Sequence, residues 1–380
     1  MDDKNFSLMA HFEGIADPRV DRRKLHKLID IIVIALCAMI AGCDTCDEFE
    51  IFGNSHLEWL KSFLELPNGI PSHDTFERVF ARIDPKQFKQ CFANWTKSLV
   101  GIFSGVIAID GQTHRGARQS SQVKSTVHMV SAWAAGLRMV LAQTRVGEKT
   151  NEITAIPEVL SMLDIRGCIV TMDAMGCQQA IAKQIIDQQG DYVLGLKGNQ
   201  ETTLTAVQEH FSTTSDDKCG TYCEADKGHG RIEERTYLAV DSNSVIDMKE
   251  WPGIKSVIKV ISVREMKDKT TTEDRFYLSS LEAASVKISA NAIRSHWGVE
   301  NSLHYVLDVT FGQDKSRIRN GNAPENIGIL RHLAMNILRG APEAKKGSPS
   351  VNLKRRRAGM DLKYLDRIIK NSVTLDNSGI

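Results

Sequence analysis

The sequence lacks an apolar run long enough to cross a membrane. The longest, Ile31 to Cys43, is shorter than the roughly 20 residues that a membrane-spanning helix needs, and it predicts a buried helix instead. The N-terminus also lacks the basic and then apolar order of a secretory signal. We therefore expect a cytoplasmic protein with no membrane partner.

An excess of charge of either sign is also absent. The chain has 48 Lys and Arg residues against 47 Asp and Glu, a formal charge of +1, which excludes a global attraction to nucleic acid. One local excess is present, because residues 341–370 contain nine Lys and Arg against three acids. We expect residues 341–380 to form a basic C-terminal tail.

The cysteines show no disulfide framework, because the eight are scattered mainly through apolar segments. Two closely spaced pairs, Cys43 with Cys46 and Cys219 with Cys223, leave a zinc site open as an alternative. No pair of histidines at zinc-finger spacing accompanies them, and this favours reduced thiols.

The length of 380 residues exceeds that of one typical domain, and 42% hydrophobic with 25% charged residues excludes a largely disordered chain. Residues 1–100 predict a helical domain, in which capping boxes at Thr45 and Ser55 and the Asp84-Pro85 pair mark helix starts.

The pattern changes at Gly105 to short β-favouring runs separated by helical stretches. Strands are expected over 105–110, 126–134, 137–146, 167–173 and 191–196, and helices over 151–163 and 177–188. This mixed order predicts an α/β domain over 101–340 whose strand order reverses inside the sheet. Residues 200–288 predict a β-rich insertion, and a helical pattern returns at Ser289.

Two of the predicted strands end in an aspartate followed by small residues, at Asp110 and Asp173. Ligands of open α/β sheets bind beyond the carboxyl ends of the strands, so the two carboxylates meet there if the strands are parallel neighbours. Their repulsion is relieved by a divalent cation with oxygen ligands. The alternative is that each aspartate only caps the turn that follows it.

The helix expected after residue 289 supplies a third carboxylate. Its apolar stripe contains Trp297 and Leu307 together with Glu300 and His304. A buried carboxylate needs a partner, so Glu300 is a candidate third metal ligand. Pairing of Glu300 with Arg294 or His304 is the alternative.

Six motifs in order resemble the H-repeat-associated insertion-sequence transposases. They are IAIDGQTHRGA (108–117), IVTMDAMGCQ (169–178), DYVLGLKGNQ (191–200), HGRIEER (229–235), HWGVENSLHYVLDVTFGQD (296–314) and NAPENIGILRHLAMNIL (322–338). The helical region over 8–100, with GIPSHDTFERVF at 69–80, resembles the same family, so the likeness covers nearly the whole chain.

The resemblance implies an RNase H-like mixed sheet with a β-rich insertion, preceded by an all-helical N-terminal domain. It implies a DDE transposase that hydrolyses phosphodiester bonds at element ends and transfers strands into target DNA. Asp110, Asp173 and Glu300 are then the catalytic and metal-binding triad, with two Mg²⁺ ions per site and Mn²⁺ as a substitute. The implied partners are double-stranded DNA, as terminal inverted repeats and as target, and further copies of the chain when DNA is bound.

Other positions in these motifs are candidates for contact with DNA, through phosphate neutralisation or base stacking. They are Arg115, Lys197, Arg231, His296, Trp297, His304 and Arg317. Three positions depart from the family pattern. Gln112, His296 and Leu307 stand where the family and its superfamily have Lys, Arg and Lys.

Two alternatives remain open. These lost cations are consistent with a catalytically decayed relic of a mobile element that binds DNA without cutting it. His296, Glu300 and His304 also recur every four residues, so with Asp173 they form a candidate transition-metal site of a zinc metalloenzyme.

Overall fold

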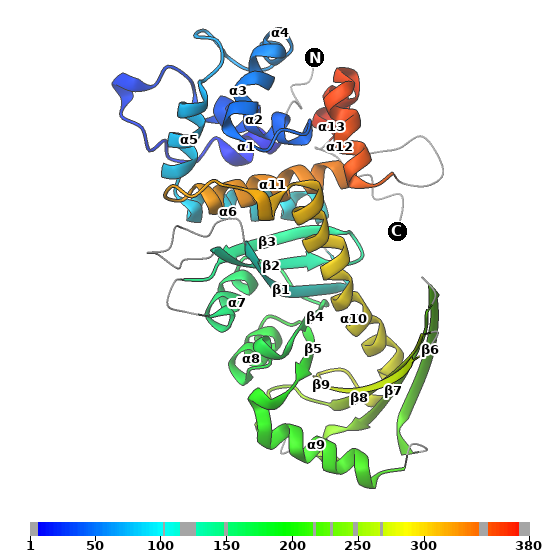
Figure 1. Cartoon of the computed structure of the whole chain (residues 1–380). Coiled ribbons are helices and arrows are strands. Elements are labelled where there is room, and N and C mark those ends of the chain that lie inside the picture. The colour runs from blue at the N-terminus through cyan, green and yellow to red at the C-terminus, as the bar shows by residue number, and fades with distance from the viewer. Residues whose placement is uncertain are drawn as a thin grey trace.

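The structure is a computed structural model. It describes residues 7–101, 103–114, 127–147, 151–215, 218–228, 231–245, 250–266, 269–341 and 349–371. Helices gather at one end, a mixed sheet occupies the centre, and long strands extend at the other end (Figure 1). In the described part of the chain, no helix combines the length and apolarity that crossing a membrane requires.

The N-terminal helices form where the sequence predicts them. They are α1 (Ser7–Phe12), α2 (Leu28–Ile40), α3 (Cys46–Ser55), α4 (Leu57–Leu60), α5 (His73–Arg82) and α6 (Pro85–Val100). The apolar run becomes α2, which is buried nearly all round. Thr45 closes the predicted capping box with Glu48. The box predicted at Ser55 is wrong, because that hydroxyl donates to the Ile51 carbonyl inside α3.

The described strands form one nine-stranded sheet of order β3-β2-β1-β4-β5-β9-β8-β7-β6. Its first half contains β1 (Val106–His114), β2 (Val127–Ala134), β3 (Met139–Arg145), β4 (Ile169–Met172) and β5 (Asp191–Leu196). The helices α7 (Glu152–Ser161) and α8 (Gln179–Asp187) follow β3 and β4. The predicted hairpin is the antiparallel β2–β3 pair, and β1 and β4 are parallel neighbours as expected.

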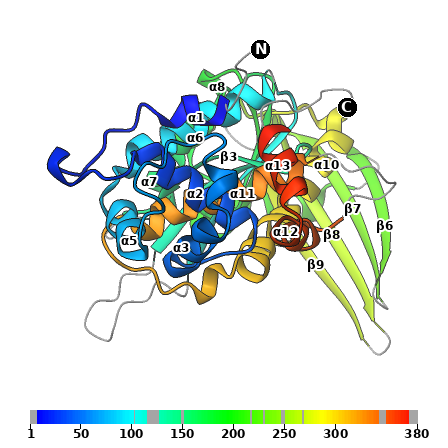
Figure 2. The same ribbon diagram turned by 90° about the horizontal axis from the view of Figure 1, so that it is seen from above.

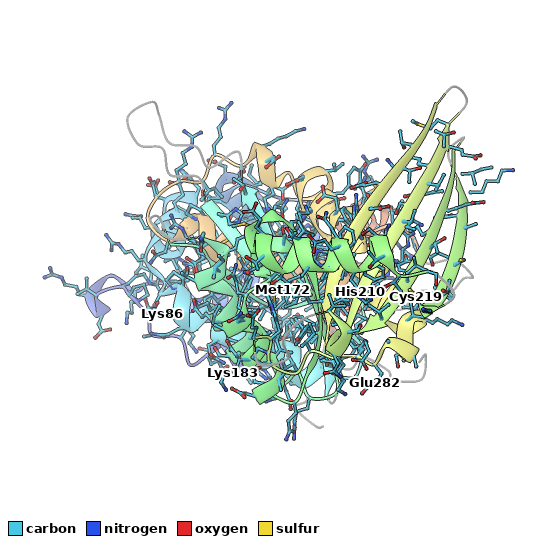
Figure 3. The ribbon with its side chains drawn as sticks, turned by 90° about the horizontal axis from the view of Figure 1, so that it is seen from below. Lys86, Met172, Lys183, His210, Cys219 and Glu282 are labelled. Carbon is cyan, nitrogen blue, oxygen red and sulfur yellow. The ribbon has the colours of Figure 1, made fainter. Side chains whose placement is uncertain are left out.

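The segment expected as an insertion continues the same sheet. It comprises α9 (Glu201–Thr213), β6 (Gly220–Gly228), β7 (Arg231–Asp241), β8 (Ser256–Met266) and β9 (Lys269–Ser279). Because β9 pairs antiparallel with β5, the four strands extend the sheet, and they project to one side as long curved ribbons (Figure 2). Met172, at the end of β4, lies in the interior of the molecule (Figure 3).

The helix after β9 changes its winding where it reaches β1. It is α-helical as α10 (Val286–Val299) and then π-helical over Glu300–His304 and Val306–Thr310. The α-helical part packs on the sheet face formed by β1, β4 and β5. π-helical turns are rare and occur frequently at functional sites.

The segment predicted as a basic C-terminal tail is mostly helical in its described part. Helix α11 (Ala323–Gly340) is followed by α12 (Val351–Met360) and α13 (Leu362–Asn371), which lie beside the N-terminal helices (Figure 1). One apolar cluster runs from Leu8 to Ile369, so the helical domain extends beyond residues 1–100. The basic residue Arg355 is buried and forms an ion pair with Asp44.

Helix α11 joins this helical core to the sheet through polar side chains. Asn336 accepts a hydrogen bond from the Val140 amide at 3.0 Å and donates to the Val140 carbonyl at 2.8 Å. Val140 belongs to β3, the edge strand. Backbone groups on the side of β3 that faces away from β2 have no neighbouring strand to pair with, and Asn336 serves those of Val140.

We expect Asn336→Ala to lower the free energy of unfolding by about 2–4 kcal/mol, because it leaves two buried backbone groups unsatisfied. Urea denaturation compared with the parental protein measures the change. Asn352→Ala, at an exposed position of α12, is the matched control and should change stability by less than about 0.5 kcal/mol. Equal effects of the two substitutions would contradict this role of Asn336.

Candidate active site

The register of β1 and β4 places two carboxylates side by side. Ile109 pairs with Met172 in the parallel ladder, so Asp110 and Asp173 follow at the same level of the sheet. The prediction that Asp110 ends its strand is wrong. The strand β1 continues beyond it to His114, beside the antiparallel β2. Asp173 does follow the end of β4 and caps the next turn by accepting from the Met175 amide at 2.9 Å. The capping alternative therefore describes a contact of Asp173, whereas Asp110 accepts at 2.9 Å from the amide of Gly111, which is still within β1.

Both aspartates line a cavity of about 590 Å³, and Glu300 lines the same cavity. The three predicted carboxylates thus come from β1, from the end of β4 and from the start of the π-helical segment. The prediction that Glu300 is buried is wrong, since 74% of its side chain is exposed.

His304 lies between two of the carboxylates. Its Nδ1 atom is 3.0 Å from Glu300 Oε2, the contact expected as an alternative, and 3.9 Å from Asp110 Oδ2. The imidazole is buried, so the structure does not support the predicted direct contact of His304 with DNA. Carboxylates repel at short range, and Glu300 turns towards this imidazole rather than towards Asp110.

Burial raises the pKa of Asp110 to about 6, with smaller effects from Asp173 and Glu152 that also raise it and from His304 that lowers it. Loss of hydration also raises the pKa of Asp173, and the Glu152 carboxylate adds to that shift. Negative charge is therefore disfavoured on both aspartates, and a cation in the cavity would relieve it.

The donor set fits a hard divalent cation in its chemistry. Asp110, Asp173 and Glu300 offer only carboxylate oxygens, which are the ligands that Mg²⁺ takes. Within the described residues, however, no group of three or more His, Cys, Asp and Glu side chains is arranged to hold one metal ion.

The same finding applies to the zinc alternatives. The described residues bring neither the His296, Glu300 and His304 set nor the cysteine pairs together as a metal group. The spacing of four residues that suggested the histidine set assumes an α-helix, whereas the chain is π-helical from Glu300 onward. The Nδ1 atom of each imidazole already has a partner, Thr171 for His296 and Glu300 for His304.

The predicted DNA-contact residues separate into three groups. Lys197, His296 and Trp297 line the cavity with the carboxylates. Arg317 lies in a different cavity. Arg115 lies outside the described residues, as does the side chain of Arg231 at the start of β7.

The three residues that depart from the family pattern, Gln112, Leu307 and His296, make contacts within the protein. Gln112 donates to Asp308 Oδ2 at 3.0 Å and accepts from Gln313 at 3.2 Å, which ties β1 to the π-helical segment. Leu307 is buried in the helical core. Burial lowers the pKa of His296 to about 4, with a smaller effect of His304, so this imidazole is neutral at pH 7.

The strand β9 adds cavity residues that the sequence did not reveal, since they lie far along the chain in an alternating strand. Arg275 stacks on the exposed Trp297 ring, with its Cζ atom 4.3 Å from the ring centroid. It also pairs with Glu273 at 2.8 Å, so its charge is partly balanced. Lys197 forms no ion pair with the residues described here, but it lines the cavity and its positive charge acts on the Asp173 and Glu273 carboxylates.

A second pair missed by the sequence lies against Gly111, next to Asp110. His128 Nε2 is 2.6 Å from Glu152 Oε1, and His128 Nδ1 is 2.7 Å from the Thr113 hydroxyl. A Cβ atom at residue 111 would collide with both the Glu152 carboxylate and the His128 ring. Glycine therefore allows this pair to approach β1 beside the aspartates.

Comparisons with known proteins match two regions of the chain to protein families. Residues 102–337 match the family described as Transposase DDE domain, and residues 9–96 match the family described as DDE_Tnp_1-associated. The "H repeat-associated putative transposase YhhI" of Escherichia coli K12 is 40% identical over 96% of this chain and 98% of its own length. The "Putative transposase YncI" of Escherichia coli O157:H7 is 39% identical over 96% of this chain and 94% of its own length.

Among solved structures, the synaptic complex of piggyBac transposase with hairpin DNA aligns with 93% of this chain and 77% of that chain. The TM-score is 0.42 and the sequence identity is 11%, a likeness too weak to support a conclusion.

We expect Asp110→Asn to stabilise the protein at pH 8 by about 1–3 kcal/mol and to leave stability at pH 4 nearly unchanged. The folded pKa of about 6 lies above the unfolded value of 3.8, so stability is lost as pH rises through this window and Asp110 ionises. The measurement is urea unfolding with EDTA present. A substitution effect of the same size at both pH values would contradict the raised pKa.

Proposed function

Because the chain belongs to the DDE-domain transposase family, we propose that it cuts DNA at the ends of a mobile element and joins those ends to target DNA in one Mg²⁺-dependent site. The observation that carries this proposal is the convergence of Asp110, Asp173 and Glu300 on one cavity. The order β3-β2-β1-β4-β5, with only β2 antiparallel to its neighbours, supports an RNase H-like sheet for the catalytic domain.

The carboxylates of Asp110, Asp173 and Glu300 would hold the metal ions. When bound, the ions supply Lewis-acid charge that activates a water molecule and stabilises the leaving oxygen. Asp110 and Asp173 are positioned by strand register, whereas Glu300 is exposed and held only by its contact with His304. The two aspartates therefore set the position of the site, and Glu300 completes it.

Positively charged and aromatic groups around the cavity would position the DNA. Lys197 offers an ammonium group to a phosphate, and Trp297, held by Arg275, offers a ring face to a base. The neutral His296 adds no charge where the superfamily has arginine, so Lys197 carries the larger share of phosphate neutralisation.

The chemistry proceeds in two displacements at phosphorus. In the first, water attacks the phosphodiester at the element end, and the bond to the 3′ oxygen breaks to release a 3′-OH. In the second, that 3′-OH attacks a target phosphodiester, forms a new bond to phosphorus and releases a different 3′-OH. Charge and position are all that the protein must contribute.

We expect Asp110→Asn to reduce Mg²⁺-dependent nicking of DNA that carries the element's own ends by at least about 100-fold, since a metal ligand is lost. Binding to the same DNA should change little. The measurement is nicking of a supercoiled plasmid, with Asp187→Asn on the exposed face of α8 as the control.

Parental-level cleavage by Asp110→Asn would overturn the triad. A readout independent of activity is the thermal shift with Mg²⁺, which should raise the melting temperature of the parental protein and not that of Asp110→Asn. DNA binding by the parental protein without any nicking would identify the relic and exclude the transposase activity.

A further inference from the structure

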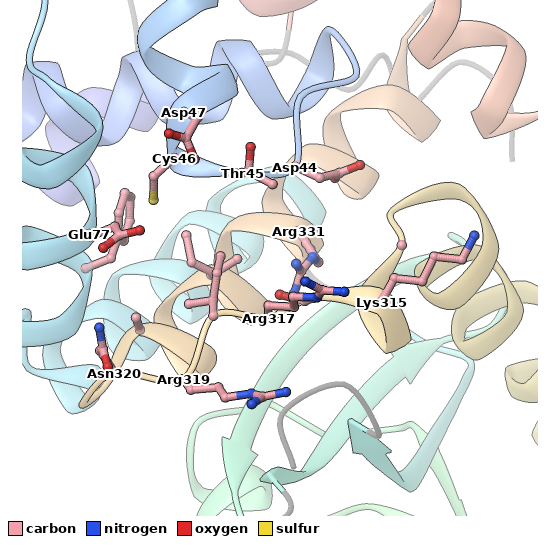
Figure 4. A pocket seen from close by; sticks show the side chains of 16 residues that line it. Asp44, Thr45, Cys46, Asp47, Glu77, Lys315, Arg317, Arg319, Asn320 and Arg331 are labelled. Carbon is pink, nitrogen blue, oxygen red and sulfur yellow. The ribbon is translucent and has the colours of Figure 1, made fainter. Parts of the chain in front are cut away.

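A second cavity, of about 670 Å³, lies between the helical domain and the loop that leads into α11 (Figure 4). It shares no lining residue with the candidate active site. Its walls come from the start of α3, from α5, from the loop over 312–320 and from α11. Its size is within the range that accommodates a nucleotide-sized ligand.

One wall of this cavity contains a buried arginine without a hydrogen-bonding partner. Arg331 is 2% exposed, and its Nε and Nη2 atoms form no hydrogen bond with any described residue. Burial lowers its pKa to about 10, so the guanidinium still carries its charge at pH 7. A buried charge that lacks a hydrogen-bonded counterion is strongly unfavourable, and an anion in the cavity would supply one.

Asp44, the acid whose charge acts on Arg331, already forms an ion pair with another arginine. Asp44 accepts from Arg355 through both oxygens, at 2.6 and 3.2 Å. Arg355 is held in turn by the Met39 carbonyl at 2.9 Å. Asp44 therefore neutralises Arg355, and the charge of Arg331 remains in excess.

The rim of the cavity adds further positive charge. Lys315, Arg317 and Arg319 are exposed and line it. Neither Lys315 nor Arg317 forms an ion pair with the part of the chain that is described. Asp47 and Glu77 lie on the opposite side, away from these cations (Figure 4). An anion is thus directed to the side where Arg331 lies.

We propose that this cavity binds a phosphate group of a DNA strand, with Arg331 donating hydrogen bonds from the buried wall and Lys315 and Arg317 contacting the same phosphate or its neighbour from the rim. The planar fork of arginine donors matches phosphate oxygens. The choice of DNA as the source of the phosphate rests on the proposed function. The rim loop also follows directly on the π-helical segment that begins at Glu300, so one stretch of chain serves both cavities.

The first test uses inorganic phosphate and the full chain. Calorimetric titration at constant ionic strength should give a phosphate affinity that Arg331→Gln lowers at least about ten-fold. The double variant Lys315→Gln/Arg317→Gln changes only exposed side chains and keeps the test valid if Arg331→Gln fails to fold. Arg356→Gln, exposed on α12, is the matched control and should bind phosphate as the parental protein does. Parental affinity in the double variant would overturn the proposal.

The second test distinguishes the two sources of phosphate. A short DNA duplex should compete with phosphate, and the double variant should reduce the slope of log affinity against log salt by about 1–2. Competition by thymidine monophosphate with none by the duplex would overturn DNA as the source. Asp110→Asn should retain parental phosphate affinity, so a failure of the cutting activity is distinguishable from a failure of this site.

Discussion

The parallel pairing of β1 with β4 is the constraint on which the site depends. It sets Ile109 opposite Met172 and therefore brings two carboxylates to one level of the sheet, although 63 residues separate them in the sequence. A slip of one residue would turn every side chain of one strand to the other face and separate the pair. Gly111 allows the His128–Glu152 pair to lie against the same strand, and α10 packs on β1 and leads directly to Glu300, which lines the same cavity.

Electrostatics divide the molecule into two regions of opposite character. The cavity at the ends of the central strands concentrates acids whose ionisation is opposed by burial, which suits it to cations. The cavity beside α11 contains a buried guanidinium with lysine and arginine at its rim, and its acids are Asp44, which pairs with Arg355, and the more distant Asp47 and Glu77. A net charge near zero thus conceals two sites of different charge, and composition alone reveals neither.

Much of the fold follows from local patterns in the sequence. The β-favouring runs before Asp110 and Asp173 predict their strands because apolar residues on both faces suit a central parallel sheet. The winding at Glu300 was not predictable, because helical periodicity is judged against 3.6 residues per turn and a π-helical turn takes more. Within the predicted stripe, His304 and Leu307 are buried, whereas Trp297 and Glu300 are exposed where they line the cavity.

Other features depend on contacts between distant parts of the chain. The pairing of β9 with β5 makes one sheet from what the sequence presents as a separate insertion. The cations over 341–370 suggest a solvated tail. Arg355 is nevertheless buried, because its guanidinium donates hydrogen bonds to Asp44 and to three backbone carbonyls. Arg331 sits in an apolar helix with no local feature to distinguish it from a surface residue.

The position of α11 has a consequence for biosynthesis. The apolar helix α2 is covered partly by α11, and the core they share closes only with residues near the C-terminus. Domains near the N-terminus generally fold first while the ribosome is still working. In this protein the apolar core of the N-terminal helices also contains residues between Ala323 and Ile369, so it is complete only after those residues have been synthesised. A chain released before α11 is made would leave apolar surface of α2 uncovered, and exposed apolar surface favours aggregation.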